Sequence, residues 1–183
     1  MRSILPEHEN PLLRDPAKDI QLDDIGSPHT KKLIADMKKL LAKEEFGVAL
    51  AAPQVGESVK LFIVSGRALA RDSRNSPDEE HVNEERPAVP DQVYINPELL
   101  KLSRGRTDKH EGCLSIRGKW GEVPRAEKAT VRAYDEHGMQ FTRGASGFLA
   151  HVFQHEMDHL AGVLYTDKVT RLYDEPHDEK TTH

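Results

Sequence analysis

The chain has 183 residues, of which 37% are hydrophobic and 31% charged, and its net charge is -5. This length fits one domain with a sizeable core, and the negative charge gives no electrostatic footprint for nucleic acid. No apolar run approaches the length of a membrane span. The first residues lack the apolar core of a secretory signal, and Cys113 is the only cysteine. We therefore expect a cytoplasmic protein without disulfide bonds.

The N-terminal part predicts one helix and one buried strand. Residues 1–20 carry three prolines and should be irregular. Ser27 followed by Pro28 predicts the start of an amphipathic helix that ends near Gly47. Small residues crowd positions 47–56, which allows close approach of another backbone or a ligand. The apolar run at 60–64 predicts a short buried strand.

The middle of the chain changes in composition. Residues 67–92 hold many charges and three prolines but almost no large apolar residues, which predicts a mobile surface loop. A loop of this length is either functional or an insertion, and we favour an insertion. Residues 93–95 and 99–102 predict two strands separated by a turn at Asn96-Pro97.

The remaining elements predict mostly antiparallel strands. Residues 117–121 predict a turn that carries the single tryptophan, Trp120. Period-two alternation at 129–134, followed by a Glu-His-Gly turn and residues 139–142, predicts a hairpin. We expect a short strand at 163–165 and a charged, frayed tail at 171–183.

A helix with two histidines and a glutamate lies between the hairpin and that last strand. Residues 154–160 read Gln-His-Glu-Met-Asp-His-Leu, inside an apolar run that Ser146 or Gly147 can open and Gly162 can end. Residues four apart share a helix face, so His155 and His159 can bind one cation. Glu156 then lies beside the metal and can take a proton from its water. The same pattern also occurs by chance on solvated helices, but the apolar flanks predict a buried one.

This helix supplies only two ligands, whereas a catalytic site normally has three protein ligands and one open position. Many acidic residues could serve, but Cys113 is the sharper candidate, because a thiolate binds borderline and soft metals tightly. A lone cysteine is more often an inert apolar residue. A zincin-like metallopeptidase would share the helix, but its third ligand is normally a histidine or a glutamate.

Three stretches in order resemble the peptide deformylase family. They are the small-residue loop Gly47–Gln54, the strand Glu111–Ser115 and the helix Gln154–Leu160. Supporting similarity lies at 94–97 and 123–128, and the likeness runs from Ile4 to Asp167. It matches least in the charged loop 67–92.

The resemblance implies a hydrolase that removes the N-formyl group from the formylmethionine of nascent polypeptides and releases formate. Glu156 would act as general base and then general acid, and the Gln54 amide and the Leu114 backbone N–H would stabilise the oxyanion. One divalent metal ion would be held by Cys113, His155 and His159. The family prefers Fe(II), and zinc, nickel or cobalt can substitute.

The resemblance also implies the substrate contacts. Those residues are Val48, Ala49, Gly112, Phe148 and Val152, of which Val48, Phe148 and Val152 would line the methionine pocket. Partners would be N-formylmethionyl nascent peptides, with transient ribosome association. A relative that binds metal without catalysis stays an alternative, although Gln54, Cys113 and Glu156 are all intact.

Three residues depart from the family pattern. Ala49 replaces a glycine and resists a positive φ, and Arg117 and Trp120 replace residues beside the substrate channel. His151 lies one turn before His155, and we expect it to border the pocket rather than to bind the metal. Arg125 either pairs with Glu111 behind the cysteine strand or forms an exposed ion pair of little energy.

The sequence as a whole predicts an α+β fold, with short, mostly antiparallel sheets packed around the buried helix that carries His155. Residues 1–170 would form the catalytic domain, with the insertion at 67–92, and 171–183 a charged tail.

Overall fold

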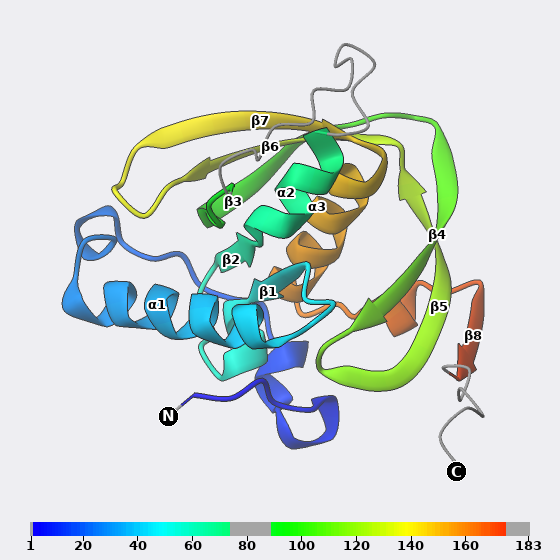
Figure 1. Cartoon of the computed structure of the whole chain (residues 1–183), viewed down its shortest axis with the longest axis horizontal. Coiled ribbons are helices and arrows are strands. Elements are labelled where there is room, and N and C mark those ends of the chain that lie inside the picture. The colour runs from blue at the N-terminus through cyan, green and yellow to red at the C-terminus, as the bar shows by residue number, and fades with distance from the viewer. Residues whose placement is uncertain (1, 74–88, 175–183) are drawn as a thin grey trace, which may run out of the picture.

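The computed structural model describes residues 2–73 and 89–174, and it has the predicted α+β fold (Figure 1). Within these residues the strands form two antiparallel sheets. The larger sheet has the strand order β1-β2-β3-β6-β7, and the smaller has the order β4-β5-β8. Helix α3 lies between the larger sheet and the β4–β5 hairpin.

The larger sheet contains the predicted hairpin and the predicted buried strand. Strand β6 pairs with β7 from Lys128 opposite Ser146 to Tyr134 opposite Gln140. Ala129, Val131 and Ala133 alternate inward along β6. The strands are β1 (Ala49–Ala51), β2 (Leu61–Val64), β3 (Gln92–Leu102), β6 (Lys128–Tyr134) and β7 (Gln140–Ser146).

The prediction of two strands around a turn at Asn96-Pro97 is wrong, because β3 runs through both residues. The chain bends there instead: Asn96 has a φ of 47°, and the register against β6 shifts between Ile95 and Glu98. The Asn96 side chain accepts from the N–H of Ile20 at 2.8 Å and donates to its carbonyl at 2.7 Å. A bulge, held by the N-terminal segment, thus takes the place of a turn.

The smaller sheet corrects two more predictions. Its strands are β4 (Arg106–Cys113), β5 (Ile116–Ala126) and β8 (Arg171–Asp174). Residues 117–121 therefore belong to β5 rather than to a turn, and the chain reverses at 114–115. The tail is not frayed at 171–174, because β8 pairs with β5 there; residues 175–183 lie outside the described part.

Short 3-10 helices replace irregular structure and one predicted strand. The segment 1–20 contains η1 (Glu7–Glu9) and η2 (Pro11–Arg14), and η3 (Leu22–Asp24) follows. A further 3-10 helix, η4 (Ala52–Val55), lies in the small-residue segment. The strand predicted at 163–165 is absent, and η5 (Tyr165–Asp167) takes its place.

Helix α1 (Pro28–Lys43) confirms the predicted amphipathic helix. The Ser27 hydroxyl caps it by accepting from the N–H of Thr30 at 3.2 Å. Its apolar stripe packs on β1 and β2 and buries Leu33, Ile34, Met37 and Leu41.

Helix α2 (Gly66–Ser73) corrects the prediction of a loop at 67–92. The Ser65 hydroxyl accepts from the N–H of Ala68 at 3.3 Å, which caps the helix. Ala68 and Leu69 are buried, and the helix packs against α3. The helix is missed because few apolar residues mark it within a polar stretch. Residues 74–88 of the predicted loop lie outside the described part.

Helix α3 (Gly147–Leu160) contacts strands of both sheets. The Phe153 ring packs against Phe62 and Tyr94, and the centroids lie 6.3 and 5.3 Å apart. The Gln154 amide donates to the carbonyl of Ala126 and accepts from its N–H, both at 2.9 Å. Beyond the helix, Gly162 has a φ of +74°, and a Cβ there would lie 2.6 Å from the carbonyl oxygen of Arg14. Glycine is therefore required where the sequence predicts the helix end.

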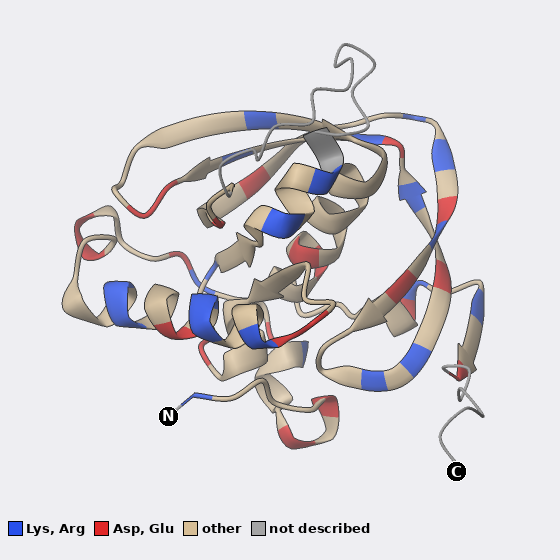
Figure 2. Ribbon diagram, in the orientation of Figure 1, with Lys and Arg blue, Asp and Glu red and all other residues tan. Residues whose placement is uncertain are grey.

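Basic and acidic residues are interspersed over α1 and both sheets (Figure 2). None of the helices in the described ranges has the length and apolar character that crossing a bilayer requires.

We predict that Phe153→Ala lowers the free energy of unfolding by about 3–5 kcal/mol, because it leaves a cavity against Phe62 and Tyr94. Urea unfolding measures the change. Met139→Ala is the control, since Met139 is 67% exposed, and its effect should stay within about 0.5 kcal/mol. Equal effects of the two substitutions would contradict this placement of the core.

Candidate active site

Cys113, His155 and His159 come together in the structure as the sequence predicts. One ligand atom from each lies within 4.8 Å of the others, and the Cys113 sulfur lies 3.3 Å from Nε2 of His159. Cys113 ends β4 after a register shift at Glu111, and the two histidines are one turn apart on α3. Donors around a tetrahedral metal ion lie roughly 3.5 Å apart. One thiolate and two imidazoles at these distances fit a divalent transition metal.

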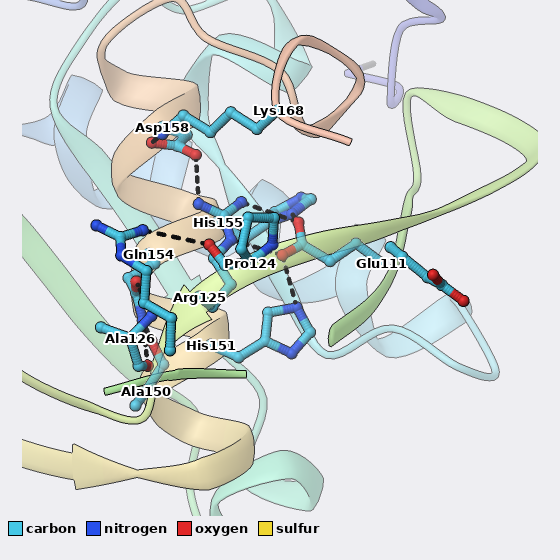
Figure 3. Close-up of polar contacts among 12 residues, drawn as sticks. Glu111, Pro124, Arg125, Ala126, Ala150, His151, Gln154, His155, Asp158 and Lys168 are labelled. Carbon is cyan, nitrogen blue, oxygen red and sulfur yellow. Dashed lines mark hydrogen bonds and ion pairs between the residues drawn. The ribbon is translucent and has the colours of Figure 1, made fainter. Parts of the chain in front are cut away.

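Glu111 is buried behind this group and binds three side chains (Figure 3). Its Oε2 lies 2.7 Å from Nδ1 of His155, and its Oε1 lies 3.2 Å from Nε2 of His151. Arg125 donates to both oxygens, at 2.6 and 2.9 Å. A proton held on Nδ1 leaves the Nε2 lone pair of His155 free for a metal ion.

Arg125 also links the smaller sheet to α3. Its Nη1 donates to Oδ2 of Asp158 at 2.6 Å, and Lys168 donates to Oδ1 at 2.6 Å. The Arg125 side chain is 3% exposed and that of Glu111 is fully buried. The alternative of an exposed ion pair is therefore wrong.

The surrounding groups shift the pKa values of the buried acids and bases. Burial alone would raise the pKa of Glu111, but hydrogen bonds from Arg125, His151 and His155 hold it well below the usual range. Burial also opposes charge on His155, yet hydrogen bonds with Cys113 and Glu111 raise its pKa. Burial and the neighbouring His155 lower the pKa of His159. Burial raises the pKa of Glu156 to about 7.

Glu156 and Gln54 are buried polar groups beside the cysteine and histidines. Oε2 of Glu156 has no hydrogen-bond partner among the described residues, and neither does Nδ1 of His159. The Gln54 oxygen accepts from the N–H of Ala51 at 2.9 Å, which directs its amide nitrogen to Ser115 and to the sulfur of Cys113, at 3.3 and 3.5 Å. A buried carboxylate oxygen without a partner suits a proton transfer that takes place only with substrate present.

A cavity of about 840 Å³ opens onto this site. Every predicted substrate residue lines it, and so do most of the predicted catalytic and metal residues. His151 lines it as well and does not belong to the group of Cys113, His155 and His159. His159 does not line the cavity. The lining residues with a predicted role are Val48, Ala49, Gln54, Gly112, Cys113, Leu114, Phe148, Val152, His155 and Glu156.

Ala49 lies in β1 opposite Val64 and causes no backbone strain. In the described residues, the positive φ values outside glycine are limited to Asn96. Ala49 therefore has no positive φ, and replacing the family's glycine by alanine does not strain the backbone here.

Sequence reasoning missed several residues of the cavity wall. Arg67 and Arg71 come from α2, and Glu45 and Phe46 come from the loop after α1. The guanidinium of Arg71 lies over the Phe148 ring at 5.0 Å. Ser65 before the apolar pair Ala68-Leu69 is the signal for α2 that could have revealed the two arginines.

Comparison with known proteins agrees with this geometry. The family model of polypeptide deformylase matches residues 1–175. The peptide deformylase of Leptospira biflexa is 38% identical over 169 residues, which are 90% of this chain and 87% of that protein.

Solved structures of similar proteins extend the comparison. The peptide deformylase of Thermotoga maritima has a TM-score of 0.73 and 30% identity, over 93% of this chain and 99% of that one. The class I type b peptide deformylase of Acinetobacter baumannii, with Met-Ala-Ser bound, has a TM-score of 0.73 and 29% identity, over 91% and 96% of the two chains. The chain therefore belongs to the polypeptide deformylase family of metal-dependent hydrolases, which remove the N-formyl group from nascent polypeptides.

Proposed function

We propose that Cys113, His155 and His159 hold the metal ion and that Glu156 transfers the protons of the deformylase reaction. The carboxyl of Glu156 carries this proposal, because it is buried, lines the cavity and has an oxygen without a partner among the described residues. A divalent ion at this site supplies a Lewis acid that polarises the formyl carbonyl and lowers the pKa of a water molecule.

Glu156 takes a proton from the attacking water as its oxygen adds to the formyl carbon. When the carbon–nitrogen bond breaks, the electron pair goes to the amine, and Glu156 delivers the proton there. The products are formate and a free amino terminus. In this proposal the position of Glu156 on α3, next to His155, keeps its carboxyl close to the reacting atoms.

Gln54 and Leu114 are proposed to stabilise the negative charge that develops on the formyl oxygen. The Gln54 amide nitrogen already faces the Cys113 sulfur, because its oxygen is fixed by the N–H of Ala51. The backbone N–H of Leu114 follows Cys113 in the turn between β4 and β5. Preorganised donors of this kind are worth about 10²–10³ in rate each.

The peptide is proposed to lie between the two sheets. Strands β1 and β4 are the outer strands of their sheets, and both contribute to the cavity wall. An outer strand offers backbone groups that an extended peptide can pair with, and Ala49 and Gly112 would supply them here. The methionine side chain would then enter the apolar pocket of Val48, Phe148 and Val152. The related protein from Acinetobacter baumannii binds the peptide Met-Ala-Ser, which supports a peptide with an N-terminal methionine as the ligand.

Fe(II) is the native ion in this proposal, and zinc, nickel or cobalt can replace it. The donor set of one thiolate and two imidazoles accepts each of these metals, and the preference for iron rests on the family resemblance.

The reaction is proposed to take place in the cytoplasm during transient association with the ribosome. The substrate is a nascent chain, and a reducing compartment keeps the Cys113 thiol from oxidation. In this proposal residues 1–170 form the catalytic domain together with β8, which pairs with β5, and the insertion proposed within 67–92 follows the part of α2 that lines the cavity.

Glu156→Gln should lower formate release from formyl-Met-Ala-Ser by at least about 10²-fold, because an amide cannot carry the proton. Its metal content should equal that of the parent enzyme. His155→Ala is the matched control, since it should lose the metal as well. Full activity of Glu156→Gln would refute the role of Glu156.

Arg125→Met should lower the free energy of unfolding by about 3–5 kcal/mol, because Glu111 loses its cation inside the protein. Metal affinity should fall by roughly 10–100-fold as His155 loses its orientation. Urea unfolding and chelator competition measure the two effects. Arg132→Met is the control, because the Arg132 pair with Glu98 is 41% and 61% exposed and worth about 1 kcal/mol or less. Unchanged metal affinity in Arg125→Met would contradict the role of Arg125 in orienting His155 through Glu111.

Anaerobically purified enzyme should contain iron in stoichiometric amount and lose activity in air, because the thiolate and Fe(II) both oxidise. Elemental analysis and formate release before and after exposure to air measure this. Stoichiometric zinc with full activity would contradict iron as the native ion.

A further inference from the structure

Phe46 is a large apolar side chain at the mouth of the cavity. It is 86% exposed and yet contributes to the cavity wall. Single exposed apolar residues are common on protein surfaces. Phe46 differs from them because the cavity that it borders leads to Glu156 and the metal ligands.

The loop that carries Phe46 is held in place by α2 and by Ser65, which lies between β2 and α2. Arg67 donates to the carbonyls of Glu44 and Glu45, at 2.9 and 3.2 Å, and the Ser65 hydroxyl donates to the carbonyl of Gly47 at 3.2 Å. A Cβ on Gly47 would lie 2.9 Å from the Glu44 Cβ, so the loop packs tightly against the end of α1. The phenyl ring is thus presented by an ordered loop.

Trp120 on β5 contributes to the same cavity. Its indole lies flat against Gly112, where an added Cβ would meet three ring carbons at 3.3–3.4 Å. Because Gly112 precedes the ligand Cys113, the indole borders the path from the metal site to solvent.

An ion pair joins the two walls that carry these rings. Arg117 on β5 donates to Glu44 at 2.8 Å, which ties the β4–β5 hairpin to the loop of Phe46. In Figure 2 an acidic segment of the loop after α1 faces basic residues at the tip of this hairpin. Lys119, also on this wall, pairs with Asp174. Arg117 and Lys119 are therefore already engaged with carboxylates.

We propose that Phe46 and Trp120 form an aromatic rim that binds apolar side chains on the two residues after formylmethionine. The inference rests on the proposed position of the formyl group at the metal site. A peptide that starts there and leaves through the cavity mouth passes the aromatic rim. Apolar side chains gain contact area at the two rings, whereas small polar side chains gain little. Phe46 and Trp120 thus determine specificity without taking part in the chemistry.

Phe46→Ala tests the proposal with two uncharged peptides of equal length, formyl-Met-Leu-Leu and formyl-Met-Ser-Ser. We expect kcat/KM for the leucine peptide to fall about tenfold, or about 1.4 kcal/mol, through a higher KM. For the serine peptide, kcat/KM should change by no more than about twofold, which corresponds to about 0.4 kcal/mol in activation free energy. Met139→Ala, at an exposed apolar residue that does not line the cavity, should change neither value.

Equal losses on both peptides, or no loss on the leucine peptide, would overturn the aromatic rim. A parent enzyme that released formate from neither peptide would instead refute the proposed function.

Trp120 provides a second readout that does not depend on turnover, because it is the only tryptophan. Formyl-Met-Leu-Leu added to the metal-loaded Glu156→Gln protein should shift the tryptophan emission to shorter wavelength. The serine peptide should cause a smaller shift at equal occupancy, measured by calorimetry. Saturating leucine peptide without any change in emission would place the peptide away from Trp120 and overturn the proposal.

Discussion

The buried ion pair between Arg125 and Glu111 holds the two halves of the site together. Arg125 binds Glu111 on β4 and Asp158 on α3, so that one guanidinium joins the smaller sheet to the central helix. Glu111 in turn fixes Nδ1 of His155. His155 and His151 on α3 also contact Glu111 directly, so that Glu111 is shared by the strand that ends at Cys113 and by the helix with the histidines. A buried pair of this kind is costly to break, so it can hold Cys113 and the two histidines in a fixed arrangement.

The cavity follows from the same arrangement. Because α3 lies between the larger sheet and the β4–β5 hairpin, the edge strands β1 and β4 border one space, and Cys113, His155 and Glu156 also line it. Helix α2 and the loop after α1 complete its outer wall. The three proposed metal ligands therefore lie on a strand and on a long helix, whereas the proposed oxyanion donors lie on a 3-10 helix and in a turn.

Local patterns predicted the centre of the molecule well. The helical period around His155 and the alternation along β6 depend on nearby residues, and the spacing of the histidines fixes their common face. Cys113 was predicted as the third ligand from the chemistry of the single thiol, and the family resemblance implied the same residue. No local rule places it beside His155, which is 42 positions away in the sequence. Helix α2 was missed because few apolar residues, among them the buried Ala68 and Leu69, mark its buried face. The bulge at Asn96 and the pairing of β8 depend on contacts with Ile20 and β5, which are distant in sequence.

The outer edges of β1 and β4, which pair with no other strand in the described part of the chain, have a consequence for the range of proteins that this enzyme can process. Every polypeptide presents the same main-chain groups, whatever its side chains. If the nascent chain pairs with these edges as proposed, binding through its main chain would accept many sequences after the initiator residue, and contacts at the cavity mouth would set the rates for individual substrates.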